Sequence, residues 1–215
     1  MKKTILTLLA IAGISVGAGT SAFAALTWDF GPSGAFTGTG PNSSTWLQAT
    51  LTQGSDADSV NVGLNWVTVP TGTKVLELYM NFATDPSSLT VSGIDPSWFQ
   101  KGEDAFKADG DGKYDLLFAN PAHGGSILTS PGSLSFTIHG TGITPASFDY
   151  NSTSAPGNGT TWPIAAHLGG YNNSVFVGGV PRHDTPVPEP ATVLAGALLL
   201  LPLGASTIRV MRKRA

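Results

Sequence analysis

The chain has 215 residues and contains no cysteine, which excludes disulfides, thiol catalysis and cysteine-ligated zinc. Only 12% of its residues are charged, against about 25% in ordinary soluble domains. Residues 25–185 hold five Lys or Arg and thirteen Asp or Glu, a net charge of −8. This acidic middle argues against a nucleic-acid partner, because like charges repel the phosphate backbone.

Residues 1–24 have the features of a secretory signal peptide. Lys2 and Lys3 precede an apolar stretch at residues 5–12, and Ala22 and Ala24 form a small-x-small cleavage site. We expect a signal helix that engages the secretion translocon and is removed by signal peptidase. The alternative is an N-terminal membrane anchor, which the short apolar stretch and the cleavage site disfavour.

Residues 25–181 are expected to form one mainly β ectodomain. Alternating apolar residues and frequent Gly, Pro, Asn and Asp turns predict many short strands and no long helix. The turn at 70–73 predicts a hairpin between the strands at 59–69 and 75–82, and residues 96–102 favour a short helical turn. This pattern is typical of a single β-sandwich of the jelly-roll or immunoglobulin-like type. The expected strands are residues 45–52, 59–69, 75–82, 89–92, 114–119, 133–139, 164–168 and 174–177.

A cluster of aspartates around two glycines is a candidate calcium loop. Asp109, Asp111 and Asp115 take the spacing of positions 3, 5 and 9 of an EF-hand loop. Two positions depart from that pattern, because Lys107 stands at position 1 and Phe118 stands where a bidentate Glu belongs. The alternative is an acidic Asp-Gly turn without metal.

The sequence around Trp98 and around Trp162 is typical of loops. Sugar-binding β-domains stack pyranose rings on exposed aromatic side chains, so these two are candidate ligand residues. The alternative for both is packing in the core or at its rim.

The sequence does not suggest an enzyme. Residues 25–185 contain no HExxH, GxSxG or SxxK pattern. Its four histidines are not spaced as ligands on one helix, and they are His123, His139, His167 and His183. We therefore expect no catalytic residue, with a hydrolase whose site is not recognisable from sequence as a further alternative.

The C-terminal stretch has three parts in a fixed order. A proline-rich linker at 182–190 ends in Pro188, Glu189 and Pro190, and an uncharged apolar run follows at 191–208. As a helix this run would be about 27 Å long, close to the bilayer core of about 30 Å. Residues 209–215 form a basic end that should remain cytoplasmic, with Arg209, Arg212, Lys213 and Arg214.

This tail resembles the PEP-CTERM sorting signal of Gram-negative bacteria. The resemblance implies that an exosortase, a membrane-embedded protease, acts near Pro188, Glu189 and Pro190. It further implies an inner-membrane intermediate and then release to the cell surface or an extracellular matrix. The tail family has also been labelled by association with ice-binding proteins. The alternative is a permanent single-span anchor beside a proline-rich stalk.

Two functions are compatible with these features. The first is an exported, non-enzymatic surface or matrix protein. The second is a module that binds exopolysaccharide through Trp98 or Trp162, with the aspartate loop as a structural calcium site. The sequence names no ligand that would decide between them.

Overall fold

The computed structural model describes residues 25–109, 112–122, 125–154, 161–171 and 173–182. All of them belong to one compact unit. The strands are β1 (Leu26–Gly38), β2 (Leu47–Gln53), β3 (Ser59–Trp66), β4 (Lys74–Met80), β5 (Thr90–Ser92), β6 (Phe99–Lys107), β7 (Gly112–Ala119), β8 (Leu128–Thr129), β9 (Ser133–His139), β10 (Thr153–Ser154), β11 (Ile164–Gly169) and β12 (Val175–Pro181). Three 3-10 turns accompany them in the described ranges, η1 (Pro86–Ser88), η2 (Pro96–Trp98) and η3 (Pro145–Phe148).

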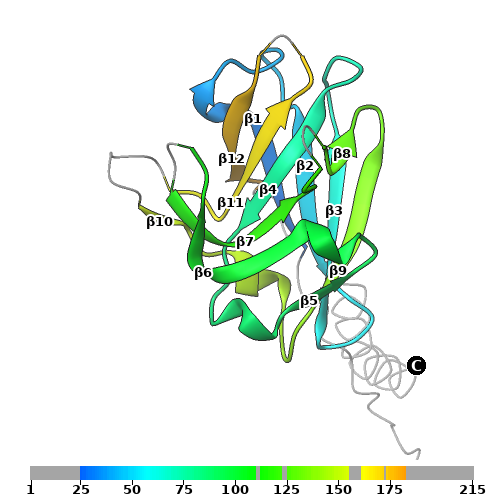
Figure 1. Ribbon diagram of the computed structural model, residues 1–215, viewed down its shortest axis with the longest axis vertical. Coiled ribbons are helices and arrows are strands. Elements are labelled where there is room, and N and C mark those ends of the chain that lie inside the picture. The colour runs from blue at the N-terminus through cyan, green and yellow to red at the C-terminus, as the bar shows by residue number, and fades with distance from the viewer. Residues whose placement is uncertain (1–24, 110–111, 123–124, 155–160, 172, 183–215) are drawn as a thin grey trace, which may run out of the picture. The chain divides into compact units, whose positions relative to one another are not determined.

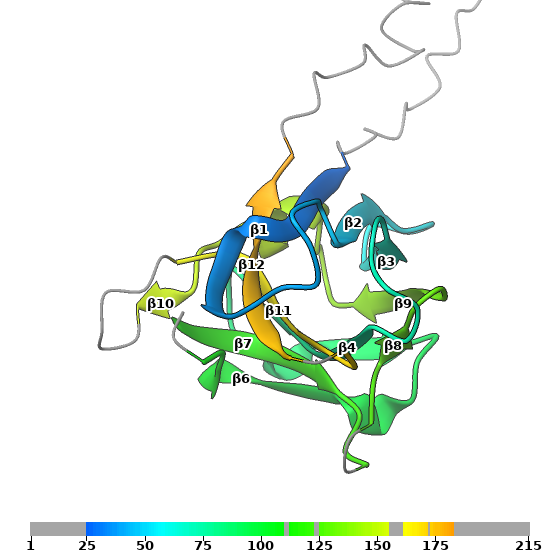
Figure 2. The ribbon, with the colours of Figure 1, turned by 90° about the horizontal axis from the view of Figure 1, so that it is seen from above.

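The strands pair into one antiparallel sheet that curls until it is nearly closed. Its order is β10-β7-β4-β11-β12-β1-β2-β3-β9-β5, with β6 beside β7 and β8 beside β4. Seen from above, β1, β2 and β3 lie across the interior from β4, β6 and β7 (Figure 2). The mainly β prediction is confirmed. No α-helix occurs among the described residues.

The two ends of the sheet approach each other at a seam between β6 and the η1–β5 segment. Lys101 of β6 donates from Nζ to the carbonyl oxygens of Ser87 and Leu89. No backbone ladder joins β5 to β6. One long side chain therefore bridges the gap that strand pairing leaves between β5 and β6. The ribbons of these two strands are labelled near each other in Figure 1.

The interior is filled by the residues that alternate inward along each strand. Val60, Val62 and Leu64 of β3 are fully buried, as a half-buried strand with a period of two requires. Phe118 of β7 contacts Phe136 of β9, with ring centroids 4.7 Å apart. Because β7 and β9 lie far apart in the strand order, this contact crosses the interior and shows that opposite parts of the sheet pack against each other.

The predicted hairpin between residues 59–69 and 75–82 is wrong. Strand β3 pairs with β2 and β9, whereas β4 pairs with β7, β8 and β11. The turn itself exists, since Thr73 donates its amide to Pro70 at 3.2 Å and Gly72 has a φ of 88°. The turn is hydrogen-bonded to the backbone of Ser130. The Ser130 carbonyl accepts from the Gly72 amide at 3.2 Å, and the Ser130 amide donates to the Thr73 carbonyl at 2.8 Å. The turn thus serves a crossover rather than a hairpin.

Every predicted strand is confirmed as a strand, and residues 96–98 form the predicted short turn. Sequence reasoning missed β1, β6 and the two-residue strands β8 and β10. β1 contains a Gly-Pro-Ser-Gly stretch and pairs with β12 through two register shifts. β6 is a polar edge strand with alternating exposed residues. Neither has the apolar alternation on which the strand predictions rest.

Candidate binding pocket beside strands β4, β6 and β7

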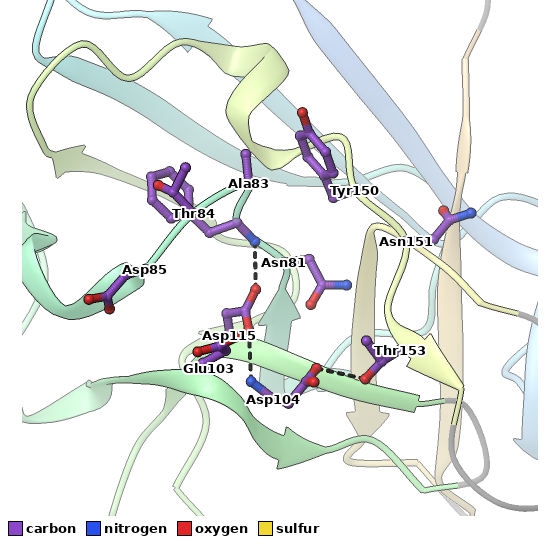
Figure 3. A pocket seen from close by; sticks show the side chains of 11 residues that line it. Asn81, Ala83, Thr84, Asp85, Glu103, Asp104, Asp115, Tyr150, Asn151 and Thr153 are labelled. Carbon is purple, nitrogen blue, oxygen red and sulfur yellow. Dashed lines mark hydrogen bonds between the residues drawn. The ribbon is translucent and has the colours of Figure 1, made fainter.

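A cavity of about 300 Å³ opens where β4 ends, beside β6 and β7 (Figure 3). We call it the acidic pocket, because four of its lining residues are carboxylic acids and none is Lys or Arg. Its lining residues come from four separate parts of the chain, Asn81, Phe82, Ala83, Thr84, Asp85, Glu103, Asp104, Asp115, Tyr150, Asn151 and Thr153.

Asp115 holds the wall of the pocket together. It lies in β7 and is only 8% exposed. Its Oδ2 accepts from the amide of Phe82 at 3.0 Å, and its Oδ1 accepts from the amide of Asp104 at 2.8 Å. One carboxylate therefore joins β7 to the end of β4 and to β6, and its oxygens satisfy two backbone donors (Figure 3).

A bulge in β6 turns two acidic residues toward the pocket. The pairing of β6 with β7 breaks register between Lys101 and Phe106. Within this break Asp104 takes a φ of 48°, a conformation that is uncommon outside glycine. The Asp104 carboxylate accepts from the Thr153 hydroxyl at 2.6 Å. The bulge thus places Glu103 and Asp104 beside β10 and at the pocket wall.

Asn81 contributes a buried polar group to the pocket. It follows β4, and its backbone amide donates to the Pro163 carbonyl at 3.0 Å. The side chain is 4% exposed. Its Nδ2 is buried and has no hydrogen-bond partner among the described residues. Leaving a buried donor unpaired is costly, so this atom is the unusual feature of the pocket.

The open side of the pocket carries an aromatic ring. Tyr150 follows η3 and is 52% exposed, one of two large hydrophobic residues exposed to this degree in the described part of the chain. Asp85 stands at the other side, where its carboxylate caps η1. The backbone N–H of Ser87, and then its hydroxyl, lower the pKa of Asp85. Asp85 therefore remains ionised at neutral pH.

Asp109 and Asp115 of the predicted calcium loop have different surroundings. Asp115 faces the acidic pocket with both oxygens bonded to backbone amides. Asp109 is exposed in the turn before β7, and its carbonyl accepts from the Thr37 hydroxyl at 3.2 Å. Asp111 lies outside the described residues. Within the described ranges, no group of three or more acidic or histidine side chains is placed to hold a metal ion. Calcium binding stays a prediction.

The two candidate sugar-binding tryptophans lie elsewhere. Trp98 is half-buried in η2 and packs against the main core. Trp162 is half-buried and packs flat on Gly178, where a Cβ would come within 2.2 Å of the indole. Neither lines the acidic pocket. Their role in sugar binding also stays a prediction.

Two histidines make side-chain contacts on the surface. His139 Nε2 lies 2.8 Å from the Ser92 hydroxyl, but no described carboxylate bonds to His139. His167 Nδ1 lies 3.1 Å from Glu77 Oε2, which also accepts from the Tyr79 hydroxyl at 2.7 Å. In a Ser-His-Asp triad a carboxylate bonds to the histidine and orients it, and no such bond to His139 occurs among the described residues. His123 and His183 lie outside the described residues.

Sequence reasoning offers Glu103 and Asp104 only as possible further calcium ligands from a neighbouring turn, and it misses Asn81 and Tyr150. These residues are remote in sequence and meet through the bulge in β6 and the turn after η3. Of the predicted calcium and sugar ligands that the structure describes, only Asp115 lines the pocket. No local motif marks the others.

The proposed signal cleavage site, residues 183–190 of the linker and the sorting tail lie outside the described residues. Within the described ranges, no helix has the length and apolar character needed to cross a bilayer. The chain matches no known protein family, no curated protein and no solved structure.

Proposed function

We propose that this is an exported, non-enzymatic protein of the cell surface or extracellular matrix, sorted and cleaved through its C-terminal tail. The observation that carries the proposal is the order of Pro188-Glu189-Pro190, the apolar run 191–208 and the basic end. The partners are the secretion translocon, signal peptidase and an exosortase. The cytoplasmic basic end and the N-terminal lysines leave residues 25–185 outside the membrane.

The fold supports a body attached at one edge. The first and last strands pair with each other, with Trp28 opposite Pro181. The amide of Arg182 donates to the carbonyl of Thr27 at 2.8 Å. The chain therefore enters and leaves the β-body through adjacent antiparallel strands, as Figure 2 shows. Loss of the first 24 residues or of the tail would leave every described strand of the body in place.

The proposal is also that the body acts as a scaffold rather than as an enzyme. What supports it is that no described carboxylate is hydrogen-bonded to His139 in the Ser92–His139 contact. We further propose that the curled sheet is a β-sandwich of the jelly-roll or immunoglobulin-like type. The support is the Phe118–Phe136 contact across the interior, 4.7 Å between centroids.

Mass spectrometry of the mature C-terminus tests the sorting proposal in a cell that carries an exosortase. The expected wild-type protein ends near Pro188-Glu189-Pro190 and lacks the mass of the apolar run and basic end. A double variant, Pro188→Ala with Pro190→Ala, should keep the tail. Pro186→Ala is the matched control in the same linker and should be processed normally. A wild-type product that still ends at Ala215 would contradict the sorting proposal.

A further inference from the structure

We propose that the acidic pocket is a binding site for one non-anionic saccharide residue. The starting observation is Asn81, whose buried Nδ2 has no partner among the described residues although it lines the cavity. A buried amide donor without an acceptor is rare in native proteins. Because Nδ2 itself is closed to solvent, a turn of the Asn81 side chain toward the cavity brings it to a ligand oxygen, which supplies the missing acceptor.

The pocket also needs donors from its ligand. Glu103 forms no side-chain hydrogen bond or ion pair with any described residue, and the Asp104 carboxylate has one described partner, the Thr153 hydroxyl. Carboxylates only accept hydrogen bonds, whereas the Asn81 amide group donates. A hydroxyl group donates and accepts at once. A ring with several hydroxyls therefore satisfies Asn81 and the carboxylates together.

Tyr150 supplies the apolar side of the site. Tyr150 is 52% exposed and lines the pocket. In Figure 3 it lies on the side of Asn81 opposite Asp104, with its hydroxyl directed away from Asn81. A pyranose has an apolar C–H face and polar hydroxyl edges. The tyrosine ring can cover the C–H face while Asn81 and Asp104 form hydrogen bonds with the hydroxyls. Tyrosine suits this role because its side chain has an apolar ring and a polar hydroxyl.

Charge and size narrow the ligand class further. Asp85, Glu103, Asp104 and Asp115 line the pocket, and no Lys or Arg does. An anionic sugar such as a uronate would meet carboxylates without a compensating cation, which is repulsive. The volume of about 300 Å³ is at the lower limit for small-ligand pockets. The site therefore accepts one neutral or amine-bearing sugar unit and rejects uronates.

Isothermal titration of the full chain tests this site. The protein is held in a zwitterionic detergent without a sugar headgroup, because glycoside detergents would compete. The probes are cello-oligosaccharides (neutral), chitosan oligosaccharides (amine-bearing) and alginate oligosaccharides (anionic). We expect saturable binding of one or both of the first two and no binding of alginate. Binding of none of the probes, or preference for alginate, would overturn the proposal.

Two variants locate the binding. Tyr150→Ala should weaken binding at least tenfold without changing the melting temperature, whereas Val67→Ala, at the other strongly exposed hydrophobic residue, should leave binding unchanged. Asn81→Leu should abolish binding yet leave the melting temperature equal or higher, because it removes an unpaired buried donor. Wild-type affinity in Tyr150→Ala would place the sugar elsewhere and refute the site. Because the site lies in the β-body, these results are independent of whether the tail is cleaved.

Discussion

Strand β7 contributes to two regions with different physical characters. Leu116 and Phe118 face the interior, where they are at most 1% exposed and pack against other apolar side chains. Asp115, between Tyr114 and Leu116, faces the acidic pocket and uses its oxygens to hold backbone amides. The interior stabilises the fold because apolar surface is removed from water. The pocket wall stabilises it through the hydrogen bonds from two backbone amides to the Asp115 carboxylate. Because side chains alternate along a strand, adjacent residues can be tested separately for these two contributions.

The largest expected effect is at the interior. Phe118→Ala should lower the free energy of unfolding by about 3–5 kcal/mol, because the ring contacts Phe136 across the sheet and Phe99 beside it. Urea denaturation measures the loss. Lys113→Ala, at an exposed position of the same strand, is the control and should change stability little. Equal effects for the two variants would mean that β7 does not line the core.

The pocket wall should be next in magnitude. Asp115→Ala leaves the amides of Phe82 and Asp104 without their acceptor, which should cost about 3 kcal/mol. Asp109→Ala alters an exposed carboxylate and should cost less than about 0.5 kcal/mol. Melting curves of both variants, with EDTA and with added Ca²⁺, also test the calcium prediction. If Ca²⁺ raises the wild-type melting temperature and both variants lose that response, the aspartates act as ligands and Asp115 has a metal role beside its structural one.

Sequence reasoning predicted the elements with strong apolar alternation and missed those without it. β3, with Val60, Val62 and Leu64 on one face, was predicted within three residues of its observed end. β6 was missed because its charges suit an edge strand, which has no periodic buried face. The hairpin prediction failed because a turn motif fixes local geometry but not the partner strand. Asp115 was selected for its charge, whereas its two amide partners come from residues 82 and 104 and leave no sequence signal.

The seam between the sheet ends should be weaker than either region. Lys101 bridges it with two bonds to the carbonyls of Ser87 and Leu89, but the residue is exposed and water can replace part of that contact. Lys101→Met keeps the aliphatic stem and removes the ammonium, and it should cost about 1 kcal/mol. Hydrogen exchange of the β5 amides should rise in this variant, while that of β3 should not. Unchanged exchange in β5 would show that the seam holds without Lys101.

The smallest effect on stability should come from replacing Glu77. Its carboxylate bonds to His167 and Tyr79 on the outer face of the sheet, away from both the interior and the pocket. The hydrogen bond from His167 is the main cause that lowers its pKa; the Tyr79 hydroxyl adds to this, while burial opposes it. A carboxyl whose folded pKa lies below its unfolded value near 4.3 stabilises the fold above that pH. This contribution disappears as the pH falls through the lowered folded pKa. Glu77→Gln should therefore melt slightly below wild type at pH 6, and the gap should narrow as the pH is lowered below the unfolded pKa near 4.3. A gap that stays the same as the pH falls would mean that packing, rather than the charge of Glu77, provides the stability.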